Sequence, residues 1–233
     1  RALGMPVARS EVRRFEGEAA IVVERYDRLA ADGAIRRLHQ EDICQALGVH
    51  PARKYQKDDG PGPKEIIGLL KSHVLPLRTA AINTTPINST NAEKSAQILG
   101  EDIDTFLDAL IFNWLIAGTD AHAKNYSVLI GGWGLVRLAP LYDITSILPY
   151  NDVDQRKAKL AMKVGDENRL HHVGLSEWRK LAVTVKTDPD ALIARVRDMA
   201  DRLPDLALDE ARRAQSEGLS HPIVSRLTDA VAA

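Results

Sequence analysis

The sequence predicts an α+β fold that is predominantly α-helical and carries small β-hairpins. Apolar residues recur at helical spacing over most of the chain, two pairs of short apolar runs flank glycine-containing turns, and no internal repeat is present. With 233 residues, of which 45% are hydrophobic and 27% charged, the chain has ample material for a buried core. The length suits one large domain or one domain with an appended lobe.

Two hairpins are expected. The first lies between Glu11 and Tyr26, and its second run, Ala19 to Val23, has the continuous apolar character of a buried strand. It ends in the charged segment 24–28. The second hairpin pairs the runs 126–130 and 135–138 around a glycine-rich turn.

Helical periodicity and breaker residues place the remaining elements. The most apolar helix, expected over Ile103–Ile116, is predicted to be the central one. The residues at 76–92 are mainly Thr, Asn, Ser and Pro, which favour turns, so a flexible loop is expected there. Other helices are expected as a short turn over 40–47, over 64–73 after a Gly-Pro breaker, and beyond Ser176, where Pro189 opens one helix, Pro204 separates it from the next and Pro222 begins the last.

Charge and cysteine content exclude several classes of function. The 31 basic and 32 acidic residues give a net charge of −1, so no global basic field grips nucleic acid or an anionic membrane. The single cysteine, Cys44, can form neither an internal disulfide nor a multi-thiolate zinc site, and we expect it to be a buried core thiol. No run is long enough to span a bilayer and no signal-peptide pattern opens the chain. We expect a soluble, cytoplasmic protein.

One short segment gathers the residue types needed for chemistry. Asp120, His122, Lys124 and Asn125 fall within six residues, and Asp143 follows 18 positions after Asn125, just past the second predicted hairpin. Phosphoryl transfer needs an aspartate to accept a hydroxyl proton, an amide oxygen and a second carboxylate to hold Mg²⁺, and a nearby cation. The five-position separation of Asp120 and Asn125, followed by a hairpin and a second aspartate, is that of a protein-kinase catalytic loop.

Each of these residues alone has an ordinary structural explanation. Asp and Asn cap helices and tolerate turn geometry, so Asp120 could be a helix N-cap and Asn125 a turn residue. The joint pattern, framed by apolar segments on both sides, favours a site. Two other functions stay open: a metal-dependent hydrolase in which Asp120, His122 and Asp143 hold a divalent ion, and a non-catalytic interaction module.

Several segments resemble the HipA family of bacterial toxin serine/threonine kinases. They are Phe112–Ile130, with its Thr-Asp-Ala-His-Ala-Lys-Asn run, Leu138–Ile144, Val23–Arg28, His39–Gly48, and Lys54-Tyr55 with Gly60-Pro61-Gly62. They appear in order over roughly the first 165 residues, and the helical remainder agrees in type. The resemblance implies a kinase-like C-terminal lobe, with residues 1–30 as a hinge hairpin at the end of an N-terminal lobe and 31–233 as the helical domain.

The resemblance also implies roles for individual residues. Asp120 would be the catalytic base, and Asn125 and Asp143 would hold Mg²⁺. ATP would lie against the remaining site residues. His122 and Lys124 would be near the phosphates and Tyr142 beside the nucleotide. Glu24 and Tyr26 would form the hinge whose backbone pairs with adenine, with Gln40 at the edge of that pocket.

The partners implied are a DNA-binding antitoxin of the HipB type, through which DNA contact would come, and a protein substrate such as an aminoacyl-tRNA synthetase. Three family features are not visible in this sequence: a glycine-containing phosphate loop, the autophosphorylated serine within it, and a phosphate-binding lysine on a following strand. The N-terminal lobe is therefore expected to be largely missing. Because each charge-assisted contact contributes about 1.5–3 kcal/mol, we expect this chain alone to be a poor kinase.

Overall fold

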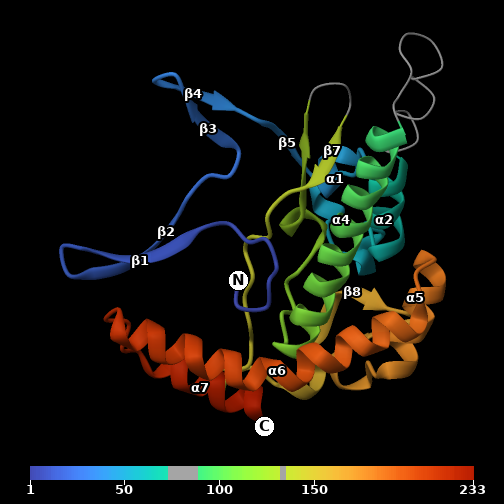
Figure 1. Ribbon diagram of the computed structural model, residues 1–233. Helices are drawn as coiled ribbons and strands as arrows, with labels where there is room; N and C mark the ends of the chain where they lie inside the picture. The colour runs from blue at the N-terminus through green and yellow to red at the C-terminus, as the bar shows by residue number, and fades with distance from the viewer. Residues whose placement is uncertain (73–88, 132–134) are drawn as a thin grey trace.

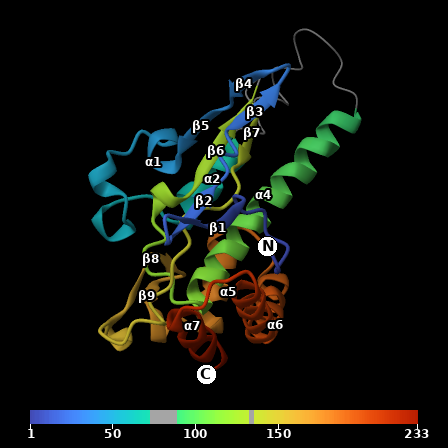
Figure 2. The same ribbon diagram turned by 90° about the vertical axis from the view of Figure 1, so that its left-hand side faces the viewer.

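The computed structural model describes residues 1–72, 89–131 and 135–233 (Figure 1). Its centre is helix α4 (Ser89–Leu115), on which Phe106, Leu107 and Ile111 are fully buried. Figures 1 and 2 show α4 between the sheet and the helices at the base of the molecule. This confirms the predicted central helix, which begins earlier than expected. Residues 76–88 of the predicted loop lie outside the described residues, and 89–92 belong to α4.

Four helices of ten or more residues join α4 in the described part of the chain. α2 (Pro63–Ser72) packs on α4, and α5 (Leu175–Val185), α6 (Pro189–Ser216) and α7 (Pro222–Ala232) follow one another at the base. Asp188 caps α6, with Pro189 in its first turn, as the sequence predicts. Within the described residues, no helix has the length and apolar character needed to cross a membrane.

The prediction that Pro204 ends a helix is wrong, because α6 continues through it to Ser216. A proline inside a helix costs about 3 kcal/mol, since it removes one backbone hydrogen bond. Met199 and Leu203 are buried before the proline, and α6 packs against α7 beyond it. This packing on both sides of Pro204 outweighs the local preference for a break.

The second predicted hairpin is confirmed and belongs to a three-stranded antiparallel sheet in the order β5–β6–β7. β5 (His39–Asp42) pairs with β6 (Ser127–Ile130), which pairs with β7 (Val136–Leu138). Asp42 ends β5 and caps the short helix α1 (Ile43–Ala46) in a reciprocal capping box with Gln45. Only the second half of the predicted 40–47 turn is therefore helical.

The described residues also form three two-stranded hairpins: β1 (Ser10–Phe15) with β2 (Glu18–Val23), β3 (Arg28–Ala31) with β4 (Ala34–Arg37), and β8 (Lys159–Val164) with β9 (Glu167–Arg169). The first confirms the predicted N-terminal hairpin, and the other two were not predicted. Short 3-10 turns occupy Pro51–Arg53, Gln56–Asp58, Ala123–Asn125, Gln155–Lys157 and Leu170–His172.

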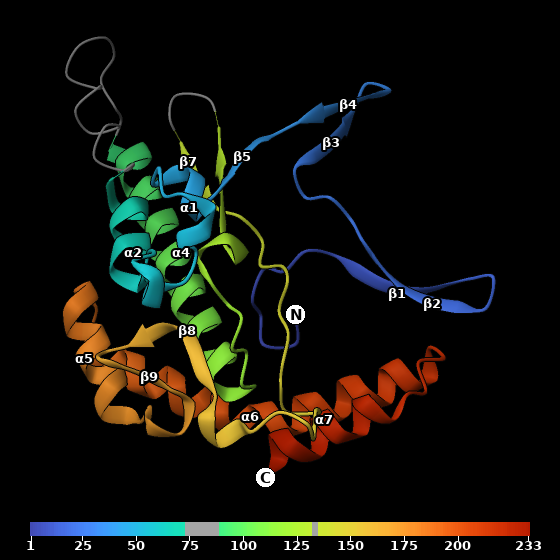
Figure 3. The same cartoon turned by 180° about the vertical axis from the view of Figure 1, so that it is seen from behind.

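The first two hairpins extend away from the helical body, as Figures 1 and 3 show from opposite sides. The prediction that Ala19–Val23 is buried is wrong: Ile21 is 74% exposed and Val23 is 51% exposed. Phe15 and Ile35 are also exposed. A continuous apolar run reveals strand propensity, but burial depends on what packs against it. The boundary between residues 1–30 and 31–233 stays a prediction.

Candidate active site

The candidate site is built where α4 ends and the chain turns back into the sheet. Ala117 adopts a left-handed backbone with φ 52°. The next residue, Gly118, leaves no room for a side chain, because a Cβ there would lie 2.3 Å from Oδ1 of Asn113. The buried Asn113 amide donates to the carbonyl of Ala109 at 2.8 Å. This close approach directs the polar loop 119–125 out of the end of the helix.

Asp120 lies exposed on this loop and has a tyrosine partner. The hydroxyl of Tyr55 donates to Oδ1 of Asp120 at 2.5 Å. This bond to a carboxylate is the main reason that the pKa of Tyr55 is raised to about 12. Oδ2 of Asp120 has no hydrogen-bond partner among the residues that the structure describes, so one carboxylate oxygen stays available to accept a proton.

His122 lies behind this pair and is buried. Its ring meets the Tyr55 ring edge-on, with 5.0 Å between centroids. Burial lowers the pKa of His122, and the nearby Lys54 lowers it further, which favours the neutral imidazole. Its Nδ1 atom is buried without a hydrogen-bond partner in the described structure. Sequence reasoning did not include Tyr55 among the site residues, because 65 positions separate it from Asp120.

The two predicted Mg²⁺ ligands meet across the β6–β7 hairpin. Nδ2 of Asn125 donates to Oδ2 of Asp143 at 2.7 Å. Asp143 is exposed, with a left-handed backbone at φ 53°, whereas Asn125 is 6% exposed. Oδ1 of Asn125 is buried and accepts no hydrogen bond of good geometry from the described residues, although the Asn125 side chain lies close enough to His122 to raise the pKa of that ring.

This pair fits a magnesium ion. An amide oxygen without a partner beside a carboxylate supplies the hard oxygen donors that Mg²⁺ prefers. By contrast, no group of three or more His, Cys, Asp or Glu residues in the described ranges could hold a metal. Asp120, His122 and Asp143 thus do not form the three-ligand set that the hydrolase alternative requires.

Lys124 is engaged elsewhere in this structure. Its Nζ lies 2.8 Å from Oδ2 of Asp42, the cap of α1, and this hydrogen bond raises the pKa of Lys124. The ion pair joins loop 119–125 to the end of β5. The position of Lys124 near the ATP phosphates stays a prediction.

Tyr26, one of the two predicted hinge residues, approaches the site through an aromatic contact. The rings of Tyr26 and Tyr142 stack with centroids 6.1 Å apart. The Tyr142 hydroxyl lies 2.5 Å from Oγ of the buried Ser127 and donates to the Lys124 carbonyl at 2.9 Å. Burial is the main cause that raises the pKa of Tyr142 to about 12. Tyr26 is therefore held beside the residue that precedes Asp143.

Ion pairs fix the segment 25–28 that follows Glu24. Asp27 is 4% exposed, and Arg25 donates to it with a 2.7 Å bond from Nε to Oδ1. Arg28 makes a second ion pair with the same carboxylate. These cations, Arg25 first, hold the pKa of Asp27 well below its usual range. A buried charge held from two sides gives this turn a defined shape.

Gln40 borders a cavity of about 430 Å³ that Arg25 and Asp27 also line. Oε1 of Gln40 is buried without a partner in the described part of the chain. The side chain of Glu24 is 69% exposed, with its Oε2 3.9 Å from Nη1 of Arg9, and its backbone N–H donates to the Arg9 carbonyl at 2.8 Å. Its role as a hinge residue stays a prediction. The structure thus brings Tyr26 to Tyr142 and places Gln40 at this cavity, whereas the Glu24 side chain lies in solvent.

Comparison with known proteins identifies the relatives of this chain. The family model described as the HipA-like C-terminal domain matches residues 1–207. The chain belongs to the HipA family. It is 35% identical over 201 residues to the putative kinase Y4mE of Sinorhizobium fredii, covering 86% of this chain and 42% of the relative. It is 32% identical over 167 residues to the serine/threonine-protein kinase toxin HipA of Shewanella oneidensis, covering 71% of this chain and 35% of the relative.

Solved structures show the same fold. The Shewanella oneidensis complex of HipA, HipB and operator DNA matches with a TM-score of 0.73 and 23% identity, covering 99% of this chain and 51% of that chain. The Helicobacter pylori proinflammatory kinase CtkA matches with a TM-score of 0.51 and 10% identity, covering 99% of this chain and 74% of that chain. The kinase-like α+β fold predicted from sequence is confirmed. This HipA-family chain spans less than half the length of the curated relatives it matches.

Proposed function

We propose that this chain is the nucleotide-binding and catalytic part of an ATP-dependent serine/threonine protein kinase of a toxin–antitoxin system. The observation that carries the proposal is the Asn125–Asp143 pair, whose buried amide oxygen lacks a partner five residues after an exposed aspartate. This arrangement offers oxygen ligands for Mg²⁺ and a carboxylate base in one loop.

In the proposed reaction Asp120 accepts the proton of a serine or threonine hydroxyl through Oδ2, while Tyr55 keeps Oδ1 occupied and fixes the carboxylate plane. Asn125 and Asp143 would hold Mg²⁺, which would supply positive charge to offset the negative charge of the ATP phosphates. Tyr26, Tyr142 and Gln40 form the nucleotide side, and His122 supports the loop as a neutral ring. Phosphate contact by Lys124 requires that it leave Asp42.

The partners proposed for the whole protein follow its relatives. The solved HipA neighbour is assembled with HipB and operator DNA, and we extend a HipB-type antitoxin to this chain, with DNA contact through that partner. The protein substrate would be a component of translation, such as an aminoacyl-tRNA synthetase. Efficient transfer would also need the glycine loop and strand lysine that this sequence does not contain.

The first test is thermal unfolding with and without ATP and Mg²⁺. A ligand at 100 times its dissociation constant adds about 2.7 kcal/mol, so the parent chain should be stabilised only when both are present. Asp143→Ala should abolish the shift, whereas Asp201→Ala, an exposed aspartate on α6, should retain it. A shift with zinc or manganese alone would instead favour a hydrolase, and no shift with any of them would favour an interaction module.

The second test concerns transfer itself and uses a form long enough to contain the phosphate loop. Asp120→Asn should lose phosphate transfer while keeping the nucleotide-dependent stabilisation, because the base does not hold the metal. Transfer at the parent rate by Asp120→Asn would show that the base assignment is wrong.

A further inference from the structure

A second cavity, of about 310 Å³, borders Asp120, which does not line the first cavity. Its lining includes Asp120 and Thr119, but neither Asn125 nor Asp143. The volume is at the lower end of the range for small-molecule pockets, which leaves room for one bulky side chain and its adjoining backbone. Asp120 therefore borders both the proposed metal loop and a separate recess.

The floor of this recess is apolar. Ile147, Val153 and Leu160 line it together with the Tyr55 ring. Leu160 is 7% exposed and belongs to the core, whereas Val153 is 39% exposed, so the apolar lining reaches from the core to the solvent. An apolar surface open to water gains free energy when a second apolar group covers it.

The rim of the recess is basic. Lys57 and Lys159 are exposed there, and neither forms an ion pair with any residue that the structure describes. Asp120 is the one carboxylate among the lining residues. Nζ of Lys57 lies 5.3 Å from the centroid of the Tyr55 ring, and neither lysine has a carboxylate partner among the described residues. Two cations without a carboxylate partner beside apolar residues suit a segment that carries both an apolar side chain and acidic residues.

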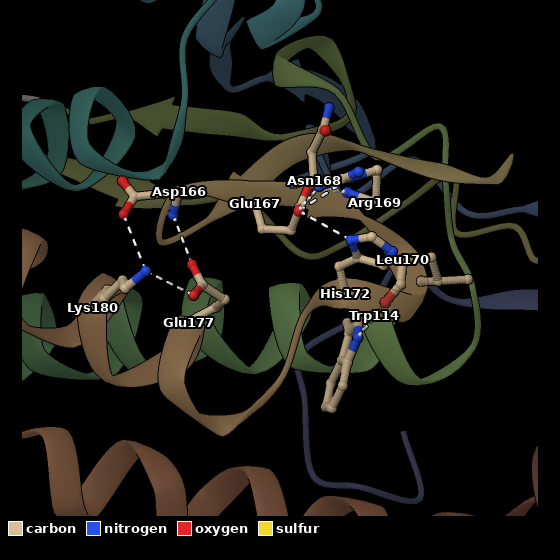
Figure 4. A network of polar contacts seen from close by, with 9 residues as sticks. All are labelled: Trp114, Asp166, Glu167, Asn168, Arg169, Leu170, His172, Glu177 and Lys180. Atoms are coloured by element: carbon tan, nitrogen blue, oxygen red, sulfur yellow. Dashed lines mark hydrogen bonds and ion pairs between the residues drawn. The ribbon is translucent and has the colours of Figure 1, made fainter. Parts of the chain in front are cut away.

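One wall is held in place before any ligand binds. The β8–β9 turn is tied to α5, because the backbone N–H of Asp166 donates to Glu177 at 3.1 Å and Lys180 pairs with both carboxylates (Figure 4). A network around Glu167 fixes β9. Asn168, which lines the recess, points its amide away from these ion pairs in Figure 4. A preformed wall lowers the ordering cost of binding.

We infer that this recess receives an apolar side chain of the protein substrate next to the accepting serine or threonine, and that Lys57 and Lys159 pair with acidic residues flanking it. The inference rests on the proposed function, because the role of Asp120 makes the adjoining recess the side from which the acceptor hydroxyl arrives. The substrate segment is thus an exposed, acidic stretch with a large aliphatic or aromatic residue beside the acceptor.

Fluorescence anisotropy of synthetic peptides tests this without requiring catalysis. The probe is a labelled peptide with a central serine, a leucine beside it and glutamates on both sides, measured with the full chain in the presence of ATP and Mg²⁺. Burial of the leucine should make this peptide bind about 10- to 100-fold more tightly than one with glycine in its place. Replacement of the glutamates by lysines should weaken binding about three- to tenfold.

Variants of the recess supply the controls. Val153→Asp places a carboxylate at the apolar mouth on an exposed residue, so the chain should stay folded and lose its preference for leucine over glycine. Lys159→Glu should weaken binding of the acidic peptide about three- to tenfold. Lys186→Glu, the same charge change at an exposed residue that ends α5 and does not line the recess, should leave it unchanged.

Equal affinity of the parent chain for the leucine and glycine peptides would overturn the inference, as would a Val153→Asp chain with undiminished preference. Nucleotide-dependent thermal stabilisation distinguishes failure of the recess inference from failure of the proposed kinase function. A chain stabilised by ATP and Mg²⁺ but indifferent to leucine would refute the recess assignment alone. A chain that prefers leucine but is not stabilised by the nucleotide would refute the proposed kinase function.

Discussion

Asp102→Ala is expected to lower the free energy of unfolding by about 3–5 kcal/mol at neutral pH. Asp102 on α4 is 5% exposed and joins this helix to β7. Its carboxylate accepts from Nε of Arg137 at 3.0 Å, from Nη2 at 3.1 Å and from the backbone N–H of Leu138 at 2.9 Å.

The magnitude follows from what the substitution leaves behind. The N–H of the buried Leu138 would lose its acceptor, which costs about 1–3 kcal/mol. Loss of the charged hydrogen bonds adds about 1.5–3 kcal/mol, toward the lower value because the Arg137 side chain is 38% exposed and can be hydrated. Urea unfolding followed by circular dichroism gives the difference.

A double-mutant cycle separates the interaction between Asp102 and Arg137 from other destabilising effects of the substitutions. Asp102→Ala and Arg137→Met should show a coupling energy of at least about 1 kcal/mol. Asp198 and Arg202, an exposed pair four residues apart on α6, provide the matched cycle, which should give no more than about 0.5 kcal/mol. Equal coupling in the two cycles, or a loss below about 1 kcal/mol for Asp102→Ala, would refute the reasoning.

Three other predictions follow from single contacts. Tyr55→Phe should cost about 0.5–1.5 kcal/mol of unfolding free energy in urea titrations, and almost nothing when Asp120 is already alanine. Gly118→Ala should lower the free energy of unfolding by about 1–3 kcal/mol, because its Cβ would overlap the anchored Asn113 amide. An unfolding curve equal to that of the parent chain, or a crystal structure in which Asn113 has not moved, would contradict this. The hydrogen bond from Arg169 is the main cause that lowers the pKa of Glu167 from 4.5 to about 2. The ionised Glu167 therefore stabilises the fold fully above pH 4.5, and this stabilisation is lost as the pH falls toward 2. Glu167→Gln should remove this part of the pH dependence of the unfolding free energy, measured between pH 2 and pH 4.5.

The parts of the site that sequence could predict are those set by local spacing. Asn125 and Asp143 meet because a short hairpin lies between them, and a hairpin is readable from a glycine turn flanked by apolar runs. Asp120 belongs to the same loop. Tyr55 reaches Asp120 through tertiary packing, since the backbone N–H of Ala123 donates to the Lys54 carbonyl at 3.2 Å, and no periodicity reports such a contact.

The errors in the fold have related physical causes. Pro204 is a local signal for a helix end, and packing on both sides of it overrides that signal. The β8–β9 hairpin contains charged residues and is held by ion pairs to α5, so the apolar alternation that marks a strand is weak there. The exposed apolar residues of β1 and β2 look like those of a buried strand because a strand needs the same residue types in either setting.

The β1–β2 and β3–β4 hairpins also bear on how the chain behaves at high concentration. In the described structure each hairpin is an isolated two-stranded sheet, so each of its strands has one edge with unpaired backbone groups. Phe15, Ile21 and Ile35 lie exposed on these same ribbons. Open edges next to apolar side chains act as templates for further strands, the first step of edge-to-edge aggregation. The substitutions Ile21→Lys and Ile35→Lys would oppose edge-to-edge aggregation by charge repulsion. Neither changes the loop that carries Asp120.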